Sequence, residues 1–202
     1  MDSTSGTMMT LIFSGALFFI SVIAHRKRWW LTFYLTASVA FMAAMIAFSI
    51  LTGLDTVIMS TEAQTIAGTA TFLGMKSVYL PPNAFIFRDP TGWSIFGIGF
   101  ECSSLIEISV LIALLIFYPG YSRESKIRYA FIGATMTYMA NLIRMLLIIY
   151  IVSVFGKSTI YLAHAIIGKL VFFLFVILLY WYLLTRPTVD MVRDMIKAGK
   201  FE

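Results

Sequence analysis

The chain has few charged residues and a single cysteine. Of its 202 residues, 12% are charged and 60% are hydrophobic, whereas a soluble domain averages about 25% charged and about 45–50% apolar residues. So few charges cannot cover a water-exposed surface, and the composition therefore excludes an ordinary soluble domain and predicts an integral membrane protein. The lone cysteine, Cys102, also excludes an internal disulfide framework.

Long apolar runs predict helices that cross a membrane, because a spanning helix needs about 20 predominantly apolar residues. The first run is followed, rather than preceded, by the basic cluster HRKR, so we expect it to be retained instead of cleaved as a signal peptide. The fold class predicted is an all-α polytopic membrane protein with a single domain, 1–202. Its five expected transmembrane helices are 8–24, 29–51, 102–118, 129–155 and 164–184.

The basic residues predict the orientation. They gather in three segments, 26–28, 123–128 and 186–200, whereas the opposite side holds only Lys76, Arg88 and Lys157. Because cytoplasmic loops carry the excess of Lys and Arg, we expect a multi-pass protein of the cell membrane with its N-terminus outside and its C-terminus cytoplasmic. The net charge of +5 then reflects topology, and no nucleic-acid partner is expected. Segment 185–202 alternates apolar and charged residues, which predicts a cytoplasmic tail helix on the inner surface.

The one large extramembrane piece is the expected extracytoplasmic loop 52–101. Its first part predicts a one-sided helix that starts with a capping box at Ser60 or Thr61 and rests on the bilayer. The runs SVYL, AFIFRDPTG and WSIFGIGF follow, separated by turn residues, and predict a small β-hairpin element that leads directly into Cys102.

Polar residues inside the expected spans are informative, because each costs at least about 2.5–3.5 kcal/mol at the bilayer centre. At a rise of ~1.5 Å per residue, Cys102, Arg144 and His164 lie about 24, 22 and 30 Å above the inner boundary. Three different helices thus bring these side chains to the outer third of a core that is ~30 Å thick. The intramembrane polar residues are Glu107, Asn141, Arg144, His164 and Lys169.

The residue types at this level suit nucleophilic acyl transfer. A thiol becomes a strong nucleophile beside a basic or cationic group. His164 could remove the thiol proton and later protonate a leaving amine, while Arg144 could lower the thiol pKa and hold a developing oxyanion. Glu107 is a candidate counter-ion for Arg144 or Lys169. One Cys, one His and one Glu fall short of a usual zinc ligand set, so neither a metal nor another cofactor is expected.

Each residue has a simpler interpretation. Cys102 could be a buried packing residue, and His164 could anchor a helix end by snorkelling. Asn141 could orient Arg144 or hydrogen-bond between helices. The main alternative function is a small transporter or channel subunit whose polar pathway runs through Arg144, Glu107 and Lys169.

Three motifs in order carry a family resemblance: ECSSLIE at Cys102, NLIRM at Arg144 and LAHAIIGKLVFF at His164. Over about residues 60–184 the chain resembles the exosortase/archaeosortase family, in a short form similar to those of Gram-positive bacteria. Two departures stand out: many relatives have about eight helices, and Ser103–Ser104 stands where Ser-Gly is common.

The resemblance implies a cysteine-type peptidase or transpeptidase, that is, an exosortase-like hydrolase that works in protein sorting at the outer face of the membrane. Its partners would be substrate proteins that end in a short motif, a transmembrane helix and a basic tail, together with a lipid or cell-surface acceptor. Cys102 would be the nucleophile, Arg144 the transition-state stabiliser and His164 the acid/base. The supporting residues expected at the site are Asn141, Glu107 and Ser103.

Overall fold

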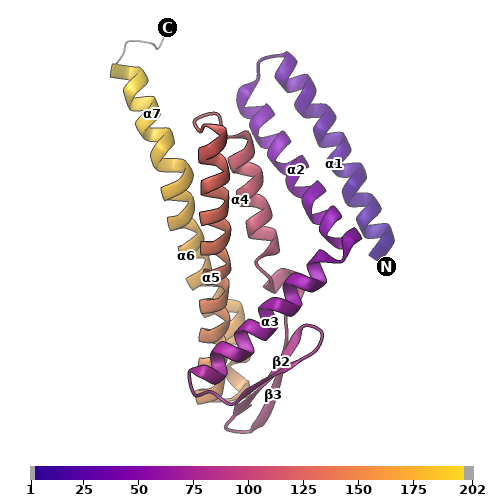
Figure 1. The fold of residues 1–202 in the computed structure, drawn as a ribbon, viewed down its shortest axis with the longest axis vertical. Coiled ribbons are helices and arrows are strands. Elements are labelled where there is room, and N and C mark those ends of the chain that lie inside the picture. Colours follow the sequence, from indigo (N-terminus) through magenta and orange to yellow (C-terminus); the bar gives the residue numbers. More distant parts are fainter. Residues whose placement is uncertain (1–2, 198–202) are drawn as a thin grey trace. The chain divides into compact units, whose positions relative to one another are not determined.

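The computed structural model describes residues 3–197. Its helices and strands follow one another in the order α1 (Ser3–Arg26), α2 (Trp30–Thr52), α3 (Leu54–Phe72), β1 (Ser77–Leu80), β2 (Ala84–Asp89), β3 (Gly92–Gly97), the 3-10 turn η1 (Phe100–Cys102), α4 (Leu105–Phe117), α5 (Arg123–Phe155), the 3-10 turn η2 (Lys157–Thr159), the π-helical η3 (Leu162–Gly168), α6 (Lys169–Tyr180), the π-helical η4 (Trp181–Thr185) and α7 (Arg186–Lys197) (Figure 1). These elements form two compact units. The first unit takes Met1–Met45, Ile108–Met136 and Phe175–Glu202, and the second takes Ile46–Glu107 and Thr137–Leu174.

The first unit is helical and is joined by hydrogen bonds from side-chain hydroxyls to main-chain carbonyls. The Ser14 hydroxyl donates to the carbonyl oxygen of Ala40 over 2.8 Å, which ties α1 to α2. The Tyr121 hydroxyl donates to the carbonyl oxygen of Leu183 over 2.6 Å. Small polar side chains at helix contacts are typical of helices packed in a membrane, where apolar surface alone gives no preference for another helix over lipid.

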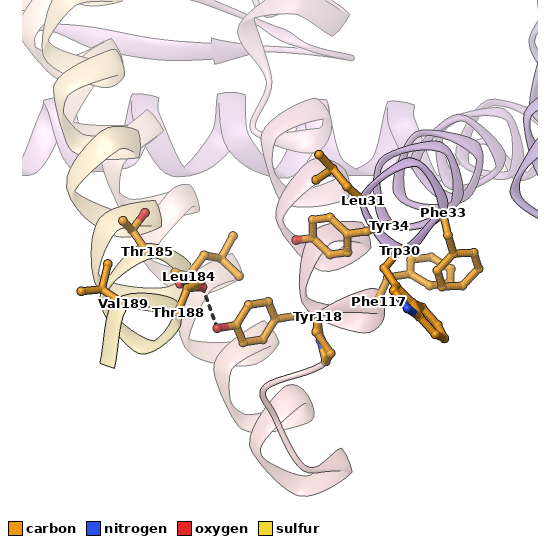
Figure 2. A pocket seen from close by; sticks show the side chains of 11 residues that line it. Trp30, Leu31, Phe33, Tyr34, Phe117, Tyr118, Leu184, Thr185, Thr188 and Val189 are labelled. Atoms are coloured by element: carbon orange, nitrogen blue, oxygen red, sulfur yellow. Dashed lines mark hydrogen bonds between the residues drawn. The ribbon is translucent and has the colours of Figure 1, made fainter. Parts of the chain in front are cut away.

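The first unit also holds an apolar cavity of about 690 Å³. Figure 2 shows its lining, with the Tyr34 ring of α2 directed toward the side on which Leu184 and Thr188 lie. The hydroxyls of Tyr118 and Thr188 hydrogen-bond to each other over 2.7 Å, so they leave the interior apolar. No cysteine, histidine or carboxylate is among the lining residues; the candidate residues Cys102, Arg144 and His164 belong to the second unit.

The second unit pairs a helix with a small sheet. The three strands are antiparallel in the order β1-β2-β3, and α3 lies across one face of the sheet (Figure 1). Side chains alternate between the two faces of a strand, so Phe85 and Phe87 both point into the core, where they join Ile66 and Ala70 of α3. The expected β element before Cys102 is thus confirmed, as a three-stranded sheet.

The helix α3 differs from the expectation for this segment. It begins at Leu54, directly after Gly53 with φ of 73°, and not at Ser60 or Thr61. The Ser60 hydroxyl instead hydrogen-bonds to the Tyr79 hydroxyl over 2.8 Å, and the Thr61 hydroxyl bonds back to the carbonyl of Val57. The predicted capping box is therefore wrong. Ile66, Ala67 and Ala70 of α3 pack into the core beside the sheet, and the prediction that α3 rests on the bilayer stays a prediction.

The expectation of a mostly helical chain with apolar helices of membrane-spanning length is confirmed. Within residues 3–197, four helical segments are long and apolar enough to cross a membrane: Gly6–Arg26, Trp30–Thr52, Arg123–Phe155 and Lys157–Lys197. The expected span 102–118 corresponds to α4, a helix of only 13 residues. The count of five spans and the orientation stay predictions. In the expected tail, α7 follows η4 without a break, and residues 198–202 lie outside the described residues.

Candidate functional site

Cys102 ends the short turn η1, which connects the sheet to α4. The carbonyl oxygen of Gly99 accepts hydrogen bonds from the main-chain N–H of Cys102 over 2.9 Å and of Ser103 over 3.1 Å. Ser103 is extended, and α4 begins only at Leu105. The cysteine therefore lies in a turn before the helix, whereas the sequence predicted that the helix starts at Cys102. The thiol is half-buried.

His164 is placed beside this thiol by the π-helical segment η3. The distance from Cys102 Sγ to His164 Nε2 is 3.7 Å, which is within hydrogen-bonding range for sulfur. The imidazole packs against the Phe96 ring of β3, with ring centroids 5.3 Å apart and planes at 62°. Within the described residues, His164 Nδ1 has no hydrogen-bond partner, so packing rather than a carboxylate orients the ring. π-helical turns occur frequently at functional sites.

Arg144 lies on α5 and is only 4% exposed. Its guanidinium group lies 5.4 Å from the centre of the Phe172 ring, a cation–π arrangement. In the described part of the chain, Arg144 Nε makes no hydrogen bond. A buried guanidinium with a free donor is chemically suited to an oxyanion or carboxylate.

The electrostatics of the thiol correct one expectation. Burial raises the pKa of Cys102, and the positive charge of Arg144 offsets only part of this effect. The expectation of a lowered thiol pKa is therefore wrong for the site as it stands. A neutral thiol needs a base before it can attack, and His164 is the group in contact with it.

Glu62 is a member of this cluster that sequence reasoning missed. It lies on α3 and is 2% exposed. One carboxylate oxygen, Oε1, accepts hydrogen bonds from the main-chain N–H of Ser104 over 2.9 Å and from its hydroxyl over 2.5 Å. Burial raises the pKa of Glu62, opposed by the Ser104 and Asn141 hydrogen bonds and by the charge of Arg144. The sequence held one signal that Glu62 is buried: it lies four and eight residues before Ile66 and Ala70, on the same face of α3.

Asn141 joins Glu62 to the turn that carries Cys102. Its side-chain amide donates to the main-chain carbonyl of Cys102 over 3.0 Å and lies 3.5 Å from Glu62 Oε1. The residue is 1% exposed. The main chain on both sides of Ser103 is thus held by hydrogen bonds: the Ser104 N–H donates to Glu62, and the Cys102 carbonyl accepts from Asn141.

The other expected supporting residues lie in the same unit. The Ser103 hydroxyl donates to the carbonyl of Phe100 over 3.0 Å, which closes the turn. Glu107 is on α4, and in the described part of the chain it forms no ion pair with Arg144 or Lys169. Its carboxylate oxygen Oε2 has no hydrogen-bond partner among the described residues. The structure therefore does not place Glu107 as a direct counter-ion.

Within residues 3–197, no group of three or more His, Cys, Asp or Glu side chains is arranged to hold a metal ion. No protein-family model, curated protein or solved structure matches the chain. The site geometry and the three motifs therefore carry the functional argument.

Proposed function

We propose that this protein is a membrane-embedded cysteine peptidase or transpeptidase. The observation that supports this most strongly is the contact of 3.7 Å between Cys102 Sγ and His164 Nε2, made by residues 62 positions apart. A pairing of nucleophile and base within hydrogen-bond reach is what acyl transfer through a thioester requires. Arg144, buried in the same unit with a free N–H, supplies the positive charge.

The proposed chemistry uses these three side chains in turn. His164 Nε2 accepts the thiol proton, and the Cys102 thiolate attacks the carbonyl carbon of the scissile peptide bond. The carbonyl oxygen becomes an oxyanion, which the Arg144 guanidinium stabilises more strongly in a poorly hydrated site than in water. His164 then gives its proton to the leaving amine, the C–N bond breaks, and a thioester remains on Cys102. An acceptor amine or water attacks the thioester carbon and passes its proton to His164. The C–S bond breaks, the product leaves, and the Cys102 thiolate takes the proton back from His164.

The resemblance to the exosortase/archaeosortase family suggests the substrates. These would be exported proteins that end in a sorting motif, a transmembrane helix and a basic tail, cleaved at the extracytoplasmic face of the cell membrane. The cleaved protein would pass to a lipid or cell-surface acceptor. An apolar chain with helices of spanning length suits substrates that are themselves anchored in the membrane.

The decisive test replaces Cys102 in cells that also express candidate substrates with this tail architecture. We expect Cys102→Ala to abolish processing, seen as accumulation of the uncleaved substrate on immunoblots, with unchanged amounts of the membrane protein. Cys102→Ser is a matched control, since it keeps the size of the side chain but supplies a far weaker nucleophile.

The rival transporter function makes the opposite prediction. If a polar pathway through Arg144 were the function, Arg144→Ala would remove every phenotype and Cys102→Ala would remove none. That result would overturn the peptidase proposal.

A further inference from the structure

The strand β3 is an edge strand that is followed in the chain by η1, the turn that carries Cys102. It pairs with β2 on one side, and the order β1-β2-β3 leaves its other side without a strand partner among the described residues. Trp93 and Ile95 are 53% and 68% exposed. An exposed edge presents a row of free main-chain donors and acceptors, which is a template for another strand.

The hydrogen-bond pattern identifies the free groups. The N–H of Ile98 donates to the carbonyl of Asn83 over 2.7 Å, so this opposed pair is hydrogen-bonded. Hydrogen-bonded pairs recur at every second residue of an antiparallel ladder. The main-chain N–H and C=O groups of Trp93, Ile95 and Gly97 therefore face away from β2, along the open edge.

This edge leads directly to the candidate site. Phe96 of β3 packs against the His164 ring, and only a few residues separate Gly97 from Cys102. A Cβ added at Gly97 or Gly99 would meet nothing within 4 Å. The folded chain alone therefore does not need glycine there for space, whereas close approach of a second main chain would.

From this geometry we propose that the open edge of β3 binds an extended segment of the substrate as a fourth strand. Main-chain hydrogen bonds to Trp93, Ile95 and Gly97 would align the segment, and the scissile carbonyl would then lie near Cys102 Sγ. Strand addition of this kind takes affinity from the main chain and selectivity from alternate side chains. The exposed apolar side chains of Trp93 and Ile95 favour apolar residues in the segment. This inference rests on the proposed peptidase function.

The test uses a generic extended electrophile, because main-chain pairing does not depend on sequence. Acetyl-tetra-alanyl chloromethyl ketone alkylates a thiol with loss of chloride, and Cys102 is the only cysteine. The purified full-length protein would be labelled with this probe and, separately, with iodoacetamide, which has no strand to add. The ratio of the two second-order rate constants isolates peptide binding from the reactivity of the thiol.

Two variants at position 95 separate the contribution of the main-chain N–H to probe binding from that of the side chain. Proline is tolerated in edge strands where its missing N–H faces outward, so Ile95→Pro removes one free donor, and Ile95→Ala removes only the side chain. We expect the ratio for Ile95→Pro to be about fivefold or more below that of Ile95→Ala, the effect of roughly one hydrogen bond. Equal ratios in the two variants would overturn the proposal.

A second comparison needs no protein variant. Two probes carrying N-methyl groups on alternate amides would differ, because only every second amide of an added strand faces β3. Equal slowing by both methylation patterns would count against strand addition.

Failure of this inference can be told apart from failure of the proposed function. If Cys102→Ala leaves substrate processing intact, the peptidase proposal fails. If processing depends on Cys102, but the rate ratio is the same for Ile95→Pro and Ile95→Ala and both methylation patterns slow the reaction equally, only the edge proposal fails.

Discussion

Glu62 gives the sharpest prediction, because the sequence offered no role for it and the structure gives it two buried hydrogen-bond donors, both on Ser104. Ser104 is fully buried, and both its N–H and its hydroxyl donate to Glu62 Oε1. Removing a buried acceptor costs about 1–3 kcal/mol for each donor left unpaired. Glu62→Ala should therefore destabilise the fold by roughly 2–6 kcal/mol, from two such donors. For a chain of this size, even 2 kcal/mol corresponds to a fall of roughly 4–8 °C in Tm.

The matched variant is Glu62→Gln, which keeps Oε1 as an acceptor and removes the charge. We expect it to stay within a few degrees of the parent, since the Ser104 hydrogen bonds remain possible. Thermal unfolding in detergent, followed by size-exclusion chromatography, measures both variants against the parent. Alkylation of Cys102 by iodoacetamide below the Tm then reports whether the turn has moved.

The outcome distinguishes two ways in which Glu62 could act. If Glu62→Gln lowers Tm as much as Glu62→Ala, the negative charge near Arg144 rather than the hydrogen bonding to Ser104 is what stabilises the site. If neither variant changes Tm or alkylation, the reasoning from buried donors is refuted.

Two further predictions concern positions outside the reacting groups. At Gly168, the last residue of η3, an added Cβ would come within 2.9 Å of Ile148 and 3.0 Å of the Ala163 carbonyl oxygen. Gly168→Ala should therefore lower the stability by about 1–3 kcal/mol through overpacking and slow the reaction of Cys102 with iodoacetamide. An unchanged Tm and an unchanged rate would contradict this prediction. At Asp89, hydrogen bonds from Ser94 and Thr91 lower the carboxyl pKa, so its stabilisation of the β2–β3 turn is present above the unfolded pKa and is lost as pH falls through the folded pKa. Asp89→Asn should flatten the acid side of the Tm–pH profile, and a variant profile with the same acid slope as the parent would show that Asp89 has no such role.

Local pattern was enough to predict the apolar helices and the strands, because hydrophobic run length and period 2 alternation are local properties. That Cys102 and His164 lie near each other was also predictable, since counting the helical rise placed both in the outer third of the membrane core. The start of α3 could not be predicted from the sequence, because Ser60 and Thr61 look like caps there. In the structure their hydroxyls bond instead to Tyr79 and Val57.

Glu62 was missed for a related reason. Its partner Ser104 is 42 residues away, and no local pattern reports a pairing across that distance. The raised pKa of Cys102 could not be foreseen either. The sequence shows an arginine that lowers it, whereas the burial that outweighs the arginine depends on how the chain packs.

The π-helical turns have a consequence for how this helix tolerates insertions and deletions. A π turn closes its hydrogen bond one residue later than an α turn, and one residue rotates a helix by about 100°. The run from Lys157 to Lys197 contains two such segments, η3 and η4. Deleting one residue within η3 would restore an ordinary α turn and swing His164 to a different face relative to α6. The register of a single residue, and not only its chemical type, therefore decides whether the imidazole meets the thiol.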